Sequence, residues 1–381
     1  MKKWWLIALF AFAAPLLSAQ GLYLEPGFRY AHHLPLPIYA DYPVYGADLR
    51  LGWQTDGSEA WEKFFNYPLV GIDFRFEHHT MKDYFDEESQ KIIDLGNSYA
   101  VFGYCNGHII KRPKFQFDYT WGIGMAYWPK GHNRLVSSPV TVHLNLDFGP
   151  VFKLNEQFDL YVRAVFSHAS NGALKVPNKG INILGAQTGF RYFPKGRASE
   201  IRDRDYPFEK YNLIYVLDGI GVRESNTMLG HYCLGNTFEI GYSRAFHPCF
   251  RYGGGIDVLY TGENKIMYAY NHAEKQYKAS DAFSIAPYIA GELCYGNFIG
   301  HLSFAYYVWQ PAEYLPRHYQ RYYERLSFRY NFGKMFFAGV GMKVHATKID
   351  YIEWTVGANL YKWEKTCRDA PWHVSTKIVR A

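Results

Sequence analysis

The residue types that ester hydrolysis requires occur together in one short stretch of the chain. His168 and Ser170 are two residues apart, so on a β-strand their side chains point to the same side. A turn rich in Gly, Pro and Asn follows, and Asn182 opens the next segment and can return beside them. A base, a hydroxyl nucleophile and an orienting group would then converge at one end of a hairpin, as in a serine esterase.

The predicted strand that carries this pair has one apolar face, and the pair lies on that face. The residues that share it are Phe158, Leu160, Val162, Ala164, Phe166, His168 and Ser170. In the returning strand Asn182 shares a face with Leu184, Ala186, Phe190 and Tyr192. Such a face would be a core in a soluble protein, whereas in a membrane barrel it faces lipid.

The rest of the chain favours the barrel. Apolar and polar residues alternate with period two over residues 47–53, 70–77, 115–127, 141–148 and 326–332. Period two over about ten residues is typical of transmembrane strands. The polar positions carry charges of both signs, such as Asp73 and Arg75, which a soluble sandwich would place in water and a barrel would place inside.

The amino-terminal residues predict export from the cytoplasm. Residues 1–19 combine Lys2 and Lys3, a short apolar run and a small-residue cleavage site before Gln20, which is the pattern of a signal peptide. No long apolar run follows, so helical membrane spans are excluded. Aromatic residues make up 19% of the chain, which suits the aromatic girdles of a barrel. The net charge of +6 is too small and dispersed to indicate nucleic-acid binding, and it is compatible with an anionic lipid surface.

The five cysteines form no recognisable framework. Their number is odd and no CxxC motif occurs, so neither a disulfide scaffold nor a zinc site is predicted. Cys233 and Cys249 could pair after export, or all five could be isolated thiols.

These patterns predict an all-β fold, an antiparallel up-and-down transmembrane β-barrel of about 16 strands in two halves of about eight. The halves could close as one large barrel or as two small ones. The predicted segments are a signal peptide (1–19), a first barrel half (20–193), a charged linker (194–210), a second half (211–363) and a polar tail (364–381). If the amino terminus is periplasmic, the seventh strand runs outward and the turn at 171–180 is extracellular.

The second half could be a degenerate repeat of the first. Its last hairpin contains His345 and Glu353, but in that register both side chains point away from the apolar face. We therefore expect them to form a polar cluster in the barrel lumen, out of reach of a lipid.

The motif His168-x-Ser170-Asn171, followed by Pro177-Asn178-Lys179-Gly180-Ile181-Asn182, resembles the lipid A 3-O-deacylase (PagL) family of outer-membrane barrels. The resemblance covers the first half, and the second half looks like that of the longer acyloxyacyl hydrolases. It implies an outer-membrane serine esterase that removes the acyl chain ester-linked at the 3 position of lipid A. Ser170 would be the nucleophile and His168 the general base, with no metal or organic cofactor. Asn171 and Gly172 match the oxyanion-hole region of the family, which stabilises the tetrahedral anion.

The sequence departs from the family at the third site residue. The family has a glutamate there, this chain has Asn182, and no acidic residue occurs between Asp159 and Glu200. Replacing the acid of a serine protease triad by its amide costs on the order of 10⁴ in turnover, yet Cys-His-Asn sites work with an amide. We expect Asn182 to orient His168 through its carboxamide oxygen.

The sequence also allows other interpretations of these residues and of the whole chain. His168 and Ser170 could be polar residues at the lipid headgroup level, and Asn171, Gly172 and Asn178 could be plain turn residues. Lys175 and Lys179 could hold the phosphates of lipid A in lipopolysaccharide, or could merely be solvated. The whole chain could be a non-catalytic barrel, such as a pore, an adhesin or a structural protein, or an esterase of other lipids.

Overall fold

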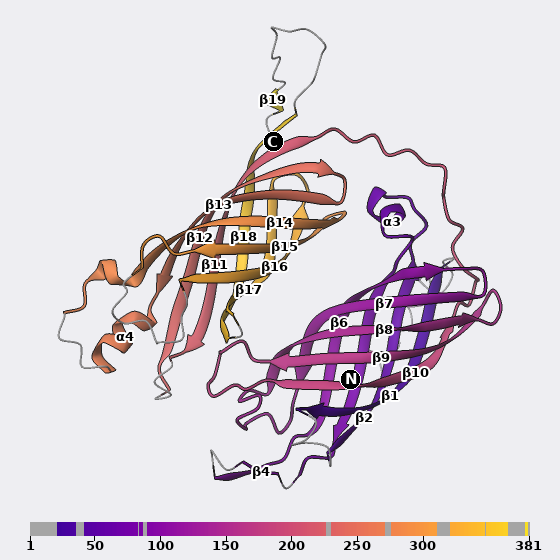
Figure 1. Ribbon diagram of the computed structural model, residues 1–381, viewed down its shortest axis with the longest axis horizontal. Helices are drawn as coiled ribbons and strands as arrows, with labels where there is room; N and C mark the ends of the chain where they lie inside the picture. Colours follow the sequence, from indigo (N-terminus) through magenta and orange to yellow (C-terminus); the bar gives the residue numbers. More distant parts are fainter. Residues whose placement is uncertain are drawn as a thin grey trace, which may run out of the picture. The chain divides into compact units, whose positions relative to one another are not determined.

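The computed structural model describes residues 21–35, 42–82, 84–86, 90–225, 230–270, 276–310, 321–346, 348–364 and 378–379. The predicted signal peptide and most of the predicted tail lie outside these residues. The chain forms two compact units, one comprising Met1–Asn171 and Pro177–Arg204, the other Gly172–Val176 and Asp205–Ala381 (Figure 1).

The first unit is a closed antiparallel barrel with the strand order β1-β10-β9-β8-β7-β6-β3-β2. Its strands are β1 (Leu22–Leu34), β2 (Pro43–Gln54), β3 (Leu69–His79), β6 (Gly96–Lys111), β7 (Phe115–Tyr127), β8 (Val140–Lys153), β9 (Phe158–Ser170) and β10 (Ile181–Tyr192). Helix α3 (Ala60–Phe64) follows β2, and the hairpin of β4 (Tyr84–Asp86) and β5 (Lys91–Ile93) follows β3 as a separate small sheet.

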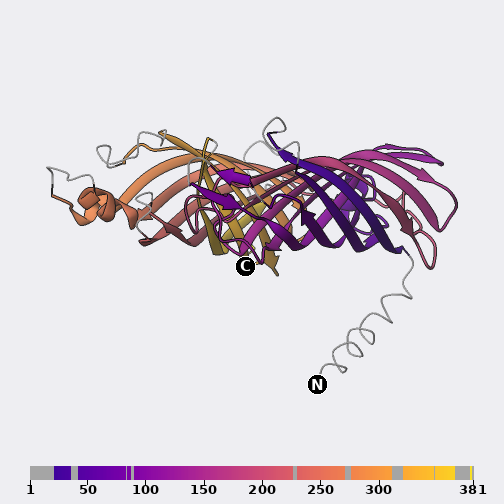
Figure 2. The same cartoon turned by 90° about the horizontal axis from the view of Figure 1, so that it is seen from below.

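The second unit is also a closed antiparallel barrel, because its first strand β11 pairs with β18. Its elements are β11 (Tyr211–Glu224), β12 (Tyr232–His247), β13 (Phe250–Thr261), α4 (Glu263–Tyr270), η1 (Ala279–Ala282), β14 (Phe283–Tyr295), β15 (Phe298–Tyr306), β16 (Tyr322–Phe332), β17 (Phe336–His345) and β18 (Lys348–Glu364). A short strand, β19 (Ile378–Val379), adds to β18. The predicted fold class is confirmed, and the two halves close as two small barrels (Figures 1 and 2).

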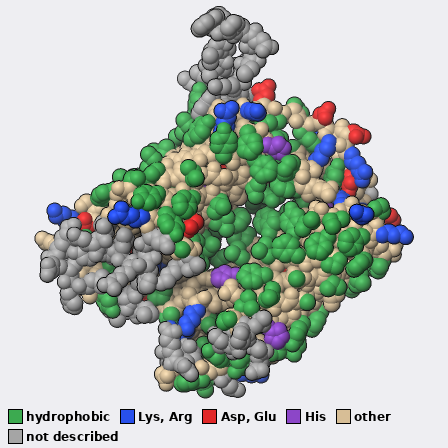
Figure 3. All heavy atoms as spheres, in the orientation of Figure 1, with side chains coloured by type: hydrophobic (Ala, Val, Ile, Leu, Met, Phe, Trp, Pro, Cys, Tyr) green, Lys and Arg blue, Asp and Glu red, His purple; other side chains and the backbone are tan. Residues whose placement is uncertain are grey.

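The alternation of residues along the strands puts the apolar side chains outside. In β9, Leu160 and Val162 are 44% and 46% exposed, whereas the residues that alternate with them, Tyr161 and Arg163, are buried. Hydrophobic side chains accordingly cover much of the surface visible in Figure 3. No helix in the described part of the chain is long and apolar enough to span a membrane.

Ion pairs fill the interior of each barrel. In the first, Glu25 accepts hydrogen bonds from Arg163 at 2.5 Å and Arg191 at 2.6 Å and pairs with Arg50 at 3.3 Å. In the second, Glu239 pairs with Arg325 at 2.8 Å and Arg329 at 3.3 Å. An eight-stranded barrel is just wide enough for side chains to fill, and these buried groups fill it.

The polar groups expected in the lumen of the second half lie there. Glu353 is fully buried and accepts a hydrogen bond from Thr237 Oγ1 at 3.0 Å. His345 is also buried, and its Nε2 lies 3.5 Å from Asp350 Oδ2. The suggested pairing of Cys233 with Cys249 is wrong. Cys233 is the second residue of β12, and Cys249 lies in the turn just beyond the other end of that strand.

Candidate active site

Strands β9 and β10 bring two of the predicted site residues together. Their register sets His168 directly opposite Asn182, so both side chains lie on the same face. That face is the outer, apolar one that carries Leu160 and Leu184. His168 Nδ1 donates a hydrogen bond to Asn182 Oδ1 at 2.8 Å. With the proton on Nδ1, the other ring nitrogen, Nε2, keeps the lone pair that a general base needs.

Ser170 is the last residue of β9 and has the same outward parity as His168. Its side chain is only 6% exposed because the following turn covers it. Its Oγ accepts a hydrogen bond from Asn178 Nδ2 at 2.8 Å. Sequence reasoning offered Asn178 only as a turn residue, and no periodicity could have shown that its side chain folds back onto Ser170.

The turn at 171–180 is tied to the loop between β7 and β8, residues 128–139. Asn171 Nδ2 donates to the Val136 carbonyl at 2.7 Å, and the Gly180 amide donates to the Leu135 carbonyl at 2.8 Å. Ser137 Oγ also donates to the carbonyl of Pro177. The Asn171 side chain therefore anchors the turn, and its main-chain N–H donates a long hydrogen bond, 3.5 Å, to Asn178 Oδ1.

Two glycines of the turn have left-handed backbone conformations, with φ of +63° at Gly172 and +72° at Gly180. A Cβ atom at Gly180 would lie 3.0 Å from His168 Cε1. The imidazole would therefore have to shift by a few tenths of an ångström if position 180 carried a Cβ atom. The conformation of the turn at Gly180 and the position of the His168 imidazole therefore depend on each other.

Lys175 and Lys179 lie on the same turn and are exposed. They carry the positive charge at this end of the first barrel that sequence analysis associated with lipid phosphates. Among the described residues, no group of three or more His, Cys, Asp or Glu side chains is placed to hold a metal ion.

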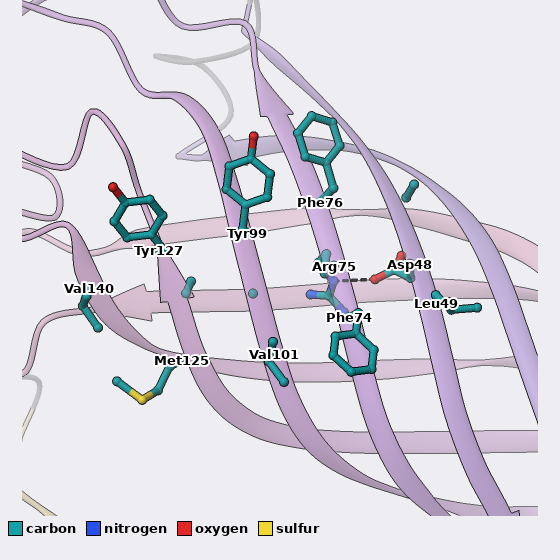
Figure 4. Close-up of a pocket in the computed structure, with 13 residues that line it drawn as sticks. Asp48, Leu49, Phe74, Arg75, Phe76, Tyr99, Val101, Met125, Tyr127 and Val140 are labelled. Atoms are coloured by element: carbon teal, nitrogen blue, oxygen red, sulfur yellow. Dashed lines mark hydrogen bonds and ion pairs between the residues drawn. The ribbon is translucent and has the colours of Figure 1, made fainter. Parts of the chain in front are cut away.

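An apolar groove of about 600 Å³ lies on the outer surface of the first barrel (Figure 4). Its side chains include Leu49, Phe74, Val101 and Met125, all of them more than 40% exposed. The ion pair of Arg75 with Asp48 lies behind them, inside the barrel.

The strand register joins this groove to the candidate site. Ser170 is opposite Val142, Val142 is opposite Met125, and Met125 is opposite Val101. The ladder continues from Val101 through Phe74 to Leu49. Ser170 ends its strand, whereas Leu49 lies midway along β2, so the apolar track runs from the edge of the barrel towards its middle.

Comparison with known families identifies the chain. A family model described as lipid A 3-O-deacylase (PagL) matches residues 47–191, and one described as acyloxyacyl hydrolase, C-terminal domain, matches residues 210–365. The chain belongs to the PagL family. The first match contains the whole candidate site, and the second coincides with the second barrel. PagL membership implies a hydrolase that acts on acyl esters, and it supports lipid A deacylation.

No curated protein matches the chain. Solved structures that resemble it weakly include CdiB from Acinetobacter baumannii, at 11% identity and a TM-score of 0.19, with 89% of this chain and 60% of that one covered. A TodX monoaromatic hydrocarbon channel mutant has 10% identity and a TM-score of 0.18, with coverage of 90% and 89%. The NanC porin has 6% identity and a TM-score of 0.16, with coverage of 89% and 98%. The family assignment does not depend on these resemblances.

Proposed function

We propose that this protein is an outer-membrane serine esterase that removes the 3-O-linked acyl chain from lipid A. The observation that carries the proposal is the hydrogen bond from His168 to Asn182, made on the outer, apolar side of the barrel two residues from Ser170. A polar pair on that face has no part in the interior ion network. Its geometry is that of a base held by an orienting group.

In the proposed reaction, Ser170 Oγ attacks the carbonyl carbon of the ester while His168 Nε2 takes the hydroxyl proton. The oxyanion forms beside the turn, where the main-chain N–H groups of Asn171 and Gly172 and the Asn178 amide are candidate donors. The lipid A 3-hydroxyl leaves with the proton from His168. Water, deprotonated by the same nitrogen, then cleaves the acyl-serine and releases a fatty acid.

The proposed role of Asn182 is to position His168. Its carboxamide oxygen fixes the imidazole tautomer, as a carboxylate would. An amide carries no charge to stabilise the imidazolium that forms when Ser170 is deprotonated. Asn182 therefore supplies orientation without the electrostatic share of a triad acid.

The apolar groove supports a lipid substrate. An acyl chain whose carbonyl is at Ser170 could follow the track from Met125 to Leu49, burying its methylene groups against exposed apolar side chains. In the outer leaflet this direction is towards the bilayer centre, as an acyl chain requires. We propose that Lys175 and Lys179, which are exposed on the turn at the headgroup end, interact with the phosphates of lipopolysaccharide.

The test is acyl release by the purified protein in detergent micelles. Mass spectrometry of the products from lipid A should show a free fatty acid and lipid A lighter by the 3-O-linked chain. Ser170→Ala should abolish both products, and Thr188→Ala, on the outer face of β10, should leave them unchanged. Equal release from phospholipids would contradict the proposed substrate, and release by the Ser170→Ala variant would contradict the site.

The alternative of a pore has less support. Buried Arg, Glu and Asp side chains fill the interior of both barrels and form hydrogen bonds and ion pairs with one another. Water-filled porins are built from many more strands than these barrels contain.

A further inference from the structure

The second barrel contains two cysteines that lie opposite each other. Cys249 is in the turn between β12 and β13, and Cys294 is near the end of β14. In the pairing of β13 with β14, Phe250 is opposite Leu293, so the next positions along the ladder are Cys249 and Cys294. The Cys294 amide donates a hydrogen bond to the Cys249 carbonyl at 2.9 Å.

This geometry suits a disulfide. Directly opposed residues that share a ladder hydrogen bond have Cα atoms about 5.5 Å apart. Disulfides usually join Cα atoms about 4.4–6.8 Å apart. Opposed side chains also share a face of the sheet. Both cysteines are free thiols in the structure and are buried, with 0% and 4% of the residue exposed.

The other cysteines of the described residues have no such partner. Cys105 is in the first unit, and Cys233 is at the far end of β12. Cys367 lies outside the described residues.

The topology puts this pair at the end of the barrel where the linker enters. Strand β11 begins there, directly after the linker, and β12 and β14 both end there. In the first barrel the linker follows β10, whose start carries the site and whose end is at the opposite edge. With the site at the cell surface, the linker end is therefore periplasmic, and the periplasm is an oxidising compartment.

We propose that Cys249 and Cys294 form a disulfide that joins the β12–β13 turn to the end of β14. The link rests on export of the chain, which the proposed location also requires, and is independent of the esterase chemistry. It would tie together two hairpins of the second barrel at their periplasmic end.

The bond forms by thiol–disulfide exchange with a periplasmic dithiol–disulfide oxidoreductase. One cysteine thiolate attacks the disulfide of that carrier, and the second cysteine then displaces the carrier from the mixed disulfide. Two thiols of this chain are oxidised, and the carrier disulfide is reduced to two thiols. Both thiols are buried in the closed barrel, where a carrier protein could not reach them, so the exchange belongs to the period before the barrel closes.

The test is differential alkylation of the full chain purified from membranes without reductant. Free thiols are alkylated under denaturing conditions, the protein is then reduced, and the released thiols receive a second label. Cys249 and Cys294 should carry only the second label, and a non-reduced digest should contain their two peptides linked. Cys105 and Cys233 should carry the first label and serve as internal controls.

Two cysteine variants test the link further. Cys249→Ser should move Cys294 into the first label, whereas Cys105→Ser should leave the link intact. First-step labelling of both Cys249 and Cys294 in the natural chain would overturn the proposal, as would a link from either to Cys367. Since the natural chain alone decides the outcome, a variant that fails to assemble does not affect it. A chain that is linked but inactive on lipid A would count against the esterase alone.

Discussion

At the scale of single residues, the site combines a serine and a histidine with an amide where the family has an acid. Asn182 Oδ1 accepts a hydrogen bond from His168 Nδ1 at 2.8 Å, so the contact that orients the proposed base is present. The missing part is the negative charge that would stabilise the imidazolium. These two contributions can be separated by substitution at one position.

Asn182→Glu is expected to retain or raise the turnover number, because it restores that charge without removing the acceptor. Asn182→Ala should lower kcat and leave KM nearly unchanged, since it releases the imidazole. The measurement is steady-state kinetics on lipid A in micelles. Thr188→Glu puts a carboxylate on the same face of β10 and should not raise kcat. Equal losses in Asn182→Glu and Asn182→Ala would show that the amide has a role that an acid cannot fill.

A second prediction concerns Asn178, whose side-chain amide donates a hydrogen bond to Ser170 Oγ at 2.8 Å. Asn178→Ala should lower kcat about 10²-fold, the usual cost of one oxyanion donor. Asn178→Asp should cost more, because it sets a negative charge beside the developing oxyanion. Asn155→Ala is the matched control: Asn155 caps the β8–β9 turn at the other end of the barrel, with Oδ1 accepting from the Phe158 amide at 2.9 Å. An undiminished kcat in both Asn178 variants would exclude the role.

The sequence predicted the positions of His168, Ser170 and Asn182 because strand parity alone sets their common face. It did not predict the contact of Asn178 with Ser170, since the conformation of an irregular turn depends on the loop against which it packs. For the same reason the sequence offered Asn171 either as an oxyanion-region residue or as a plain turn residue, and it did not predict the hydrogen bond by which its side chain anchors the turn to Val136.

At the scale of elements, the site depends on two loops that are hydrogen-bonded to each other. The turn at 171–180 is hydrogen-bonded to residues 134–137 of the loop between β7 and β8. Beneath both loops, an apolar cluster that includes Trp128, Val136, Ala169 and Ile181 closes this end of the barrel. The site therefore rests on a packed layer and not on a mobile loop.

Gly180→Ala tests this coupling. Its Cβ would lie 3.0 Å from His168 Cε1 and displace the ring, so kcat should fall at least tenfold. Gly196→Ala is the control, because Gly196 has a similar φ of +77° but nothing within 4 Å of the added atom. It should show only the backbone cost, about 1 kcal/mol or somewhat more, with deacylation unchanged. Full activity in the Gly180→Ala variant would contradict the proposed position of the base.

The strands themselves could be predicted, because period-two alternation is strong where one face meets apolar surroundings. Barrel closure could not, since alternation shows that a segment is a strand but not which distant strand it joins. The β1–β10 and β11–β18 pairs connect the ends of each half, and they decide between one barrel and two. The small β4–β5 hairpin was also missed because it is too short to show a period.

At the scale of the whole molecule, each barrel has a charged interior and an apolar exterior. A buried ion pair can be replaced by apolar side chains at little cost, but losing one partner leaves an uncompensated charge. Glu25 is the extreme case, because it contacts Arg50, Arg163 and Arg191.

Glu25→Ala should therefore lower the free energy of unfolding of the first barrel by roughly 3–5 kcal/mol. Denaturant titration of the protein in micelles, followed by tryptophan fluorescence, would measure it. Glu200→Ala is the control, since Glu200 pairs with Lys111 and Arg202 near the surface, and its loss should cost about 1 kcal/mol or less. Similar stability of the two variants would show that the interior network is not what holds the barrel closed.

The central claim is that Ser170 is the nucleophile of a lipid A deacylase at the cell surface. Mass spectrometry of lipid A extracted from cells that express either the natural chain or the Ser170→Ala variant tests it most directly. Lipid A should lose one ester-linked acyl chain in cells with the natural chain and keep it in cells with the variant, at equal amounts of assembled barrel. Loss of the chain in both, or in neither, would contradict it.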